Sequence, residues 1–96
     1  MARVVRLTPR YLRQLRACGV KPGSDAQLAA AATVRALAAA ERLPSPGDTS
    51  ALLPPVARAF VRRVTGHNLW LWYRFTGEEL AVVTMTSSPP HPVDVD

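Results

Sequence analysis

Cysteine and long apolar runs are both scarce in this chain. Its 96 residues contain one cysteine, Cys18, which excludes an internal disulfide and cannot build a metal cluster alone. No run of about 18 apolar residues occurs, so we expect no membrane-spanning segment. The first residues carry charge but no apolar signal-peptide core, which predicts a cytoplasmic protein. The length predicts one small domain.

Acidic residues are also few, and their distribution is uneven. The net charge is +5 at pH 7, and residues 1–22 and 49–77 contain basic residues but no acid. The few acids lie mostly at predicted turns, which gives little support to a mechanism with paired carboxylates. No Gly-rich phosphate loop or nucleophile elbow is present. The asymmetry favours an acidic or polyanionic partner, either nucleic acid or an acidic protein segment.

The two histidines, His67 and His91, are isolated from each other in the sequence. They lack the spacing of a metal site, so we predict no metal and no cofactor. Cys18 is most simply a buried thiol.

The first half of the chain predicts a strand and two helices. Val4, Val5 and Leu7 indicate a short first strand. Thr8 is a good N-cap for a helix that begins at Pro9 and runs to about Cys18. Ser24 and Gln27 form a capping-box pattern for a second helix, Asp25 to Arg42. Residues 43–55 are rich in proline and predict an irregular loop.

The second half predicts three strands, at residues 56–65, 68–75 and 79–86, because it is rich in β-branched and aromatic residues. Turns at residues 66–68 and 76–77 contain glycine, which can take a positive φ. Such short connections require an antiparallel meander. With both helices on one face, the fold is α+β, in the order β-α-α-β-β-β. We expect residues 1–86 to form the domain and residues 87–96 a disordered or loosely docked tail.

Alternation divides the middle strand into two faces. Leu69, Leu71, Tyr73 and Phe75 share one face, and Trp70, Trp72 and Arg74 share the other. Four arginines lie on adjacent predicted strands, and we expect them to be within reach of one another across a hairpin: Arg58, Arg62, Arg63 and Arg74. The consecutive Arg62 and Arg63 break the alternation, and a bulge there would re-aim one of them.

Arginine and aromatic side chains together suit nucleic-acid recognition. Arginine binds phosphates bidentately and stabilises developing negative charge. Trp70, Trp72 and Tyr73 could stack on bases. Tryptophans on a strand also serve often as core or interface anchors.

The element order, together with VRRVTGHNLWLWYRFTGEELAVV, resembles the RelE/ParE toxin superfamily. Val61–Val64 and Trp72–Arg74 match the segment typical of that family, and the layout covers residues 2–86. The resemblance implies the toxin of a type II toxin–antitoxin pair. RelE-like members cut messenger RNA in the ribosomal A site without a metal, and ParE-like members inhibit DNA gyrase. The strand after Glu79 departs from the RNA-cutting pattern because it ends without a tyrosine, and His91 could substitute only if the tail folds back.

The first hypothesis is therefore a RelE-like toxin that inhibits translation by cleaving mRNA on the ribosome. The residues that would hold the scissile phosphate are Arg62, Arg63 and Arg74, while Tyr73 or His67 would help in positioning or proton transfer. Further nucleic-acid contacts are expected from Arg58 and Trp72.

Two alternatives remain open, and with them the question whether the chain is an enzyme. The chain could be a non-catalytic binder, either a ParE-like gyrase inhibitor or an inactive relative, or a nucleic-acid-binding domain unrelated to toxins. Under either toxin hypothesis the partner is a cognate antitoxin, whose acidic segment would contact Arg13, Arg16 and Trp70.

Overall fold

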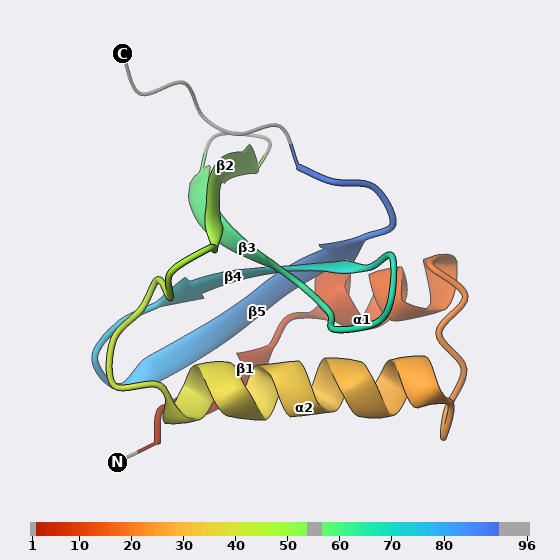
Figure 1. Ribbon diagram of the computed structural model, residues 1–96, viewed down its shortest axis with the longest axis horizontal. Helices are drawn as coiled ribbons and strands as arrows, with labels where there is room; N and C mark the ends of the chain where they lie inside the picture. The colour runs from red at the N-terminus through yellow and green to blue at the C-terminus, as the bar shows by residue number, and fades with distance from the viewer. Residues whose placement is uncertain (1, 54–56, 91–96) are drawn as a thin grey trace.

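The computed structural model describes residues 2–53 and 57–90 of the chain, which form two helices and five strands (Figure 1). In chain order they are β1 (Val4–Leu7), α1 (Pro9–Ala17), α2 (Asp25–Ala39), β2 (Thr49–Leu53), β3 (Ala57–Arg63), β4 (Trp70–Phe75) and β5 (Glu79–Thr86). The predicted α+β class is confirmed. Residues 91–96 of the predicted tail, including His91, lie outside the described residues. So does Val56, the first residue of the strand predicted at residues 56–65.

The five strands form one mixed sheet in the order β1-β5-β4-β3-β2. The predicted meander is confirmed, because β3, β4 and β5 pair antiparallel in sequence order. We expected an antiparallel sheet, and the sheet is mixed only because β1, at one edge, pairs parallel with β5. The helical hairpin separates β1 from the meander, so no tight turn fixes its direction, and parallel pairing with a distant strand is allowed.

Strand β2 lies where we predicted an irregular loop. It pairs antiparallel with β3, with Ala51 opposite Ala59. No proline lies within Thr49–Leu53, so the hydrogen-bond ladder of this strand loses no N–H group.

Both helices begin at the predicted caps. The Thr8 hydroxyl accepts a hydrogen bond from the Tyr11 N–H at 3.1 Å, and the Ser24 hydroxyl accepts one from the Gln27 N–H at 3.2 Å. Helix α2 ends at Ala39, short of the predicted Arg42, because Ala40 adopts an extended conformation. The C-terminal carbonyls of α2 gain a partner there, since the Arg3 N–H donates to the Ala38 carbonyl at 2.8 Å.

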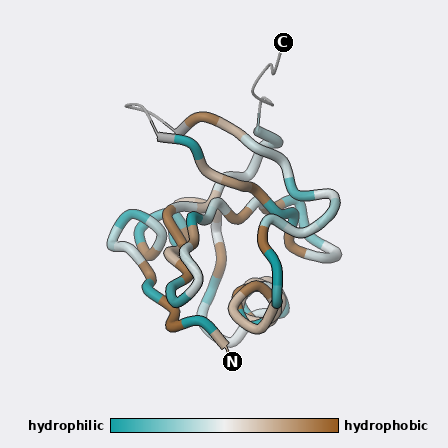
Figure 2. Tube along the Cα trace, turned by 90° about the vertical axis from the view of Figure 1, so that its left-hand side faces the viewer, coloured by the Kyte–Doolittle hydropathy of each residue, from teal (hydrophilic) through white to brown (hydrophobic). Residues whose placement is uncertain are grey.

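The main core lies between the helices and one face of the sheet. Leu71 and Tyr73, predicted to share one face of β4, are fully buried there, and Leu37 of α2 packs in the same cluster. In the view of Figure 2, α2 is seen end-on beside the strands. Helix α1 turns Tyr11 into this core, whereas the next residue, Leu12, is 48% exposed.

The opposite face of the sheet carries a second, smaller core. It contains Ala51, Ala59, Val61 and Trp72, all buried, with Trp70 and Val83 packed against them. The β3–β4 turn fits expectation, because Gly66 has a φ of +80°. The β4–β5 turn does not use a positive φ at Gly77. The Thr76 hydroxyl instead accepts hydrogen bonds from the N–H groups of Glu78 and Glu79.

Candidate nucleic-acid interface

The four strand arginines do not form one cluster, because they lie on two faces of the sheet. Arg62 pairs with Leu71 and Arg63 with Trp70 in a regular antiparallel register. Consecutive residues of a strand point to opposite faces, so Arg58 and Arg62 share the helix side while Arg63 and Arg74 share the other. The predicted bulge at Arg62–Arg63 is absent. The register shift occurs between Trp72 and Tyr73 instead.

Arg62 is engaged by Asp48, in the segment just before β2. Its Nε donates to Asp48 Oδ1 at 3.0 Å and its Nη2 to Asp48 Oδ2 at 3.2 Å. The same carboxylate accepts hydrogen bonds from the Ser45 N–H at 3.3 Å and from the Tyr73 hydroxyl. The Asp48 side chain is 4% exposed and that of Arg62 is 25% exposed. We call Asp48, Arg62 and Tyr73 the Asp48 cluster.

This cluster limits what Arg62 and Tyr73 can do chemically. Asp48 balances the charge of the Arg62 guanidinium within the fold and occupies its Nε–Nη2 edge, and only a quarter of the Arg62 side chain is exposed. Burial, and then the hydrogen bond to Asp48, raise the pKa of Tyr73 far above its ordinary value. Tyr73 therefore stays protonated as a buried hydrogen-bond donor, which does not suit a residue that must exchange a proton near neutral pH.

Arg63 lies on the opposite face and is held in place from two sides. Its Nε donates to the His67 carbonyl at 3.0 Å and its Nη2 to Asn68 Oδ1 at 2.8 Å. Its guanidinium carbon lies 5.8 Å from the ring centroid of Trp70, a cation–π distance. Two of the five guanidinium N–H donors are used in these bonds, so an edge remains available for an anion.

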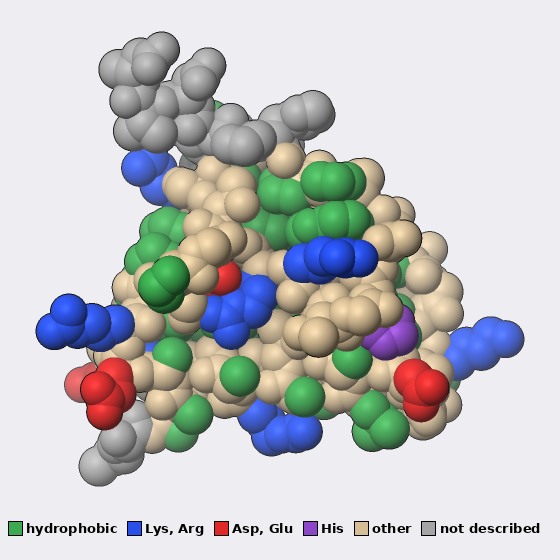
Figure 3. Space-filling view, viewed as in Figure 1, with side chains coloured by type: hydrophobic (Ala, Val, Ile, Leu, Met, Phe, Trp, Pro, Cys, Tyr) green, Lys and Arg blue, Asp and Glu red, His purple; other side chains and the backbone are tan. Residues whose placement is uncertain are grey.

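Arg74 is exposed on the same face as Trp70, four residues further along β4 and so about 13 Å away. We call Arg63, Trp70 and Arg74 the Arg63–Trp70 surface. Trp72 does not contribute a base platform to it, because this residue is 7% exposed. Its Nε1 donates to the Thr86 hydroxyl at 3.0 Å. Figure 3 shows basic and hydrophobic side chains adjoining one another on one side of the molecule.

The structure also separates the residues predicted to bind an antitoxin. Arg13 and Arg16 lie on α1 beside a groove of about 510 Å³ on the helix side of the fold. Trp70 lies on the other face of the sheet, among the residues of the second core. One short partner segment cannot reach both places without passing around the edge of the sheet.

The sequence-based interpretation missed Asp48, although one signal pointed to it. Asp48 is the only acid between Glu41 and Glu78, a stretch that contains five arginines. A single carboxylate in such surroundings is expected to pair with one of them when the chain folds. His67 contributes its backbone carbonyl to the Arg63 contact, and its side chain sits half-buried in the β3–β4 turn.

Comparisons with family models, with curated proteins and with solved structures find no match to this chain. Among residues 2–53 and 57–90, no three His, Cys, Asp or Glu side chains gather as a metal site would require. Over the same residues, neither helix has the length and apolar character needed to cross a membrane. The geometry of the two arginine sites therefore carries the functional interpretation.

Proposed function

We propose that this chain is the toxin of a type II toxin–antitoxin pair of the RelE/ParE kind, acting in the cytoplasm, and that it binds RNA without cutting it. The succession of a strand, a helical hairpin and an antiparallel meander supports the family assignment. The basic surface supports a polyanionic target.

One observation favours binding over cleavage. The residues expected to share a cleavage site are divided, since Arg62 and Tyr73 lie in the Asp48 cluster on the helix side while Arg63 and Arg74 lie on the other face. Metal-independent cleavage needs charge stabilisation and proton transfer around one phosphate. The Arg63–Trp70 surface alone offers charge and stacking, and these suffice for binding.

The proposed contacts follow from the chemistry of this surface. Arg63 is already oriented by His67 and Asn68, so little side-chain entropy is lost when its free edge meets a phosphate. Trp70 offers part of its ring to an unpaired base. Arg74 would meet a second phosphate further along the strand.

Binding is tested by fluorescence anisotropy of a labelled single-stranded RNA titrated with the wild type and with Arg63→Ala and Arg74→Ala. We expect each substitution to weaken binding and to reduce the slope of log K against log salt by about 0.7 for each phosphate that the variant no longer binds. Arg42→Ala is the matched control, because Arg42 is exposed beyond the end of α2. Equal affinities for all four proteins would refute the assigned surface.

Cleavage is tested in the same samples by the length of the RNA on a denaturing gel, and on programmed ribosomes. We expect the RNA to stay intact. Fragments that disappear in Arg62→Ala would instead favour the RelE-like hypothesis. Inhibition of supercoiling by DNA gyrase, with no RNA binding, would favour the ParE-like hypothesis.

A further inference from the structure

Strand β1 leaves one side of its backbone unpaired within the described part of the chain. It is the first strand in the order of the sheet, and all four of its residues are exposed, Val4 by 70%. The Val4 N–H donates to the Glu78 carbonyl at 2.9 Å and the Thr8 N–H to the Val82 carbonyl at 3.2 Å. In a parallel ladder each residue directs its N–H and its C=O toward the same neighbouring strand, and the next residue directs both groups to the opposite side. The backbone groups of Val5 and Leu7 therefore face the open edge, which is a template for a further strand.

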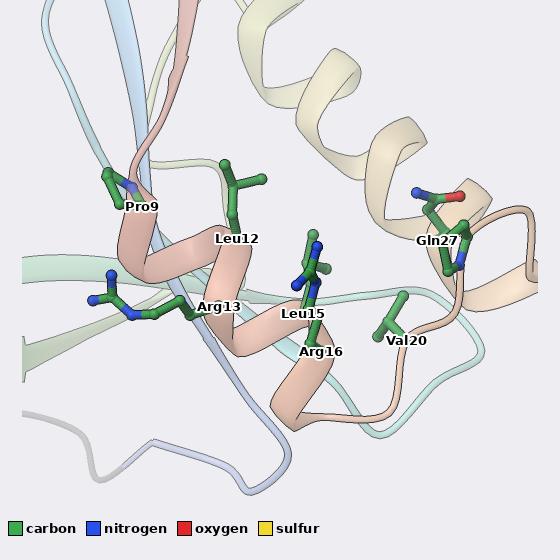
Figure 4. Close-up of a pocket in the computed structure, with 8 residues that line it drawn as sticks. Pro9, Leu12, Arg13, Leu15, Arg16, Val20 and Gln27 are labelled. Carbon is green, nitrogen blue, oxygen red and sulfur yellow. The ribbon is translucent and has the colours of Figure 1, made fainter.

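An apolar groove lies beside this edge. Its volume is about 330 Å³, and its wall includes Val5 and Leu7 of β1, Tyr11 and Leu12 of α1, and Val34 of α2. A second groove of about 510 Å³ adjoins it, because both are lined by Leu12, Leu15 and Gln27. Figure 4 shows Leu12 and Leu15 projecting from α1 toward α2, with Gln27 opposite them. Apolar side chains are thus exposed where the backbone is unpaired.

The rim of both grooves is basic. Arg13 and Arg16 line the larger groove and Arg35 the smaller one. Residues 1–22, which supply β1 and α1, contain no acid. A bare edge with this charge repels a second copy of itself, and it attracts an acidic chain.

We propose that this edge and groove bind an extended, acidic segment of a second protein, which adds a strand to β1. Its backbone would pair with Val5 and Leu7. Apolar side chains at alternate positions would enter the groove over Leu12, and acidic side chains would meet Arg13, Arg16 and Arg35. If the proposed function holds, the second protein is the antitoxin, but the binding edge lies apart from the Arg63–Trp70 surface and does not depend on RNA binding.

The test starts from a random peptide library displayed on phage and selected on the full chain. We expect the enriched peptides to combine acidic residues with apolar residues at every second position. Calorimetry with the synthesised peptide should give binding that is weakened about tenfold or more by Leu12→Asp and by Arg13→Glu. Leu28→Asp is the control, because Leu28 is 61% exposed on α2 and lines neither groove.

Hydrogen exchange provides a readout on the wild type that needs no variant. Peptide binding should slow exchange of the Val5 and Leu7 amides, which face the open edge, more than that of the Leu28 amide, which donates within the first turn of α2. Unchanged exchange at Val5 and Leu7 would overturn strand addition.

The remaining outcomes also decide the proposal. It is overturned if no peptide is enriched, if the enriched peptides lack acids, or if they bind Leu12→Asp as well as the wild type. A chain that sediments as a dimer, with Leu12→Asp monomeric, would make a second copy the occupant, and displacement of the peptide by RNA would make nucleic acid the occupant. We expect Leu12→Asp to leave RNA affinity unchanged and Arg63→Ala to leave peptide affinity unchanged, so the failure of one proposal is separate from that of the other.

Discussion

Removal of the Asp48 carboxylate should destabilise the fold strongly. In Asp48→Ala the Arg62 guanidinium loses a bidentate acceptor, and the Tyr73 hydroxyl and the Ser45 N–H each lose theirs. Arg62 has only a quarter of its side chain exposed, so water restores these bonds incompletely. Breaking one side of such a buried pair costs about 3 kcal/mol. For a domain of this size that loss lowers the melting temperature by about 12 °C or more.

The assay is thermal unfolding followed by circular dichroism, with urea unfolding to obtain free energies. Asp48→Asn should lose less than Asp48→Ala, because the amide oxygen remains an acceptor. The matched control is the exposed ion pair between Arg6 and Glu79, whose side chains are 61% and 46% exposed. Glu79→Ala should cost less than about 1 kcal/mol.

A double-mutant cycle separates the ion pair from the rest of the cluster. Arg62→Met in the Asp48→Ala background should cost less than Arg62→Met in the wild type, because the unpaired buried charge is then removed. Suppose instead that Asp48→Ala unfolds within about 1 kcal/mol of the wild type. Arg62 and Tyr73 would then find other partners, and the reasoning that Asp48 withholds Arg62 from a substrate would fail.

Three further predictions concern stability. Burial raises the pKa of Tyr73, so the folded chain keeps a proton that the unfolded chain releases near pH 10. The free energy of unfolding should therefore fall as the pH rises above about 10. Urea unfolding at several pH values should show a smaller fall for Tyr73→Phe than for the wild type. Thr8→Ala removes the α1 cap and the hydroxyl bond to the Val83 carbonyl at 2.6 Å, and should cost about 1–2 kcal/mol in urea unfolding, whereas Thr65→Ala in the exposed turn should be near neutral. Leu37→Ala, at a fully buried site on α2, should cost about 2–5 kcal/mol by the same measurement, and Leu28→Ala on the exposed side of that helix less than about 0.5 kcal/mol; equal losses would contradict the assigned packing of α2.

The features predicted correctly from the sequence depend on neighbouring residues. Thr8 and Ser24 cap helices within three residues of themselves, and Gly66 sets a tight turn. Alternation alone placed Leu71 and Tyr73 on one face of the middle strand, and that face is buried in the main core. Such signals are read from a short window, because each cause lies within a few positions of its effect.

The features that were missed depend on distant pairing. Strand β1 joins β5 from the other end of the chain, and β2 is defined only by its partner β3. Asp48 meets Arg62 and Tyr73 only after β2, β3 and β4 have aligned. The division of the arginines was within reach of the sequence. Consecutive residues of a regular strand point to opposite faces, so without the bulge that we expected, Arg62 and Arg63 must lie on different faces.

The parallel joining of β1 to β5 has a consequence for synthesis in the cell. Strand β1 is made well before its hydrogen-bond partner, which begins at Glu79, so a growing chain cannot complete this sheet until β5 has also left the ribosome. Pairing across so long a separation is also slow. During that interval the Val4–Leu7 segment has no partner strand, and its apolar side chains are available to chaperones and to aggregation.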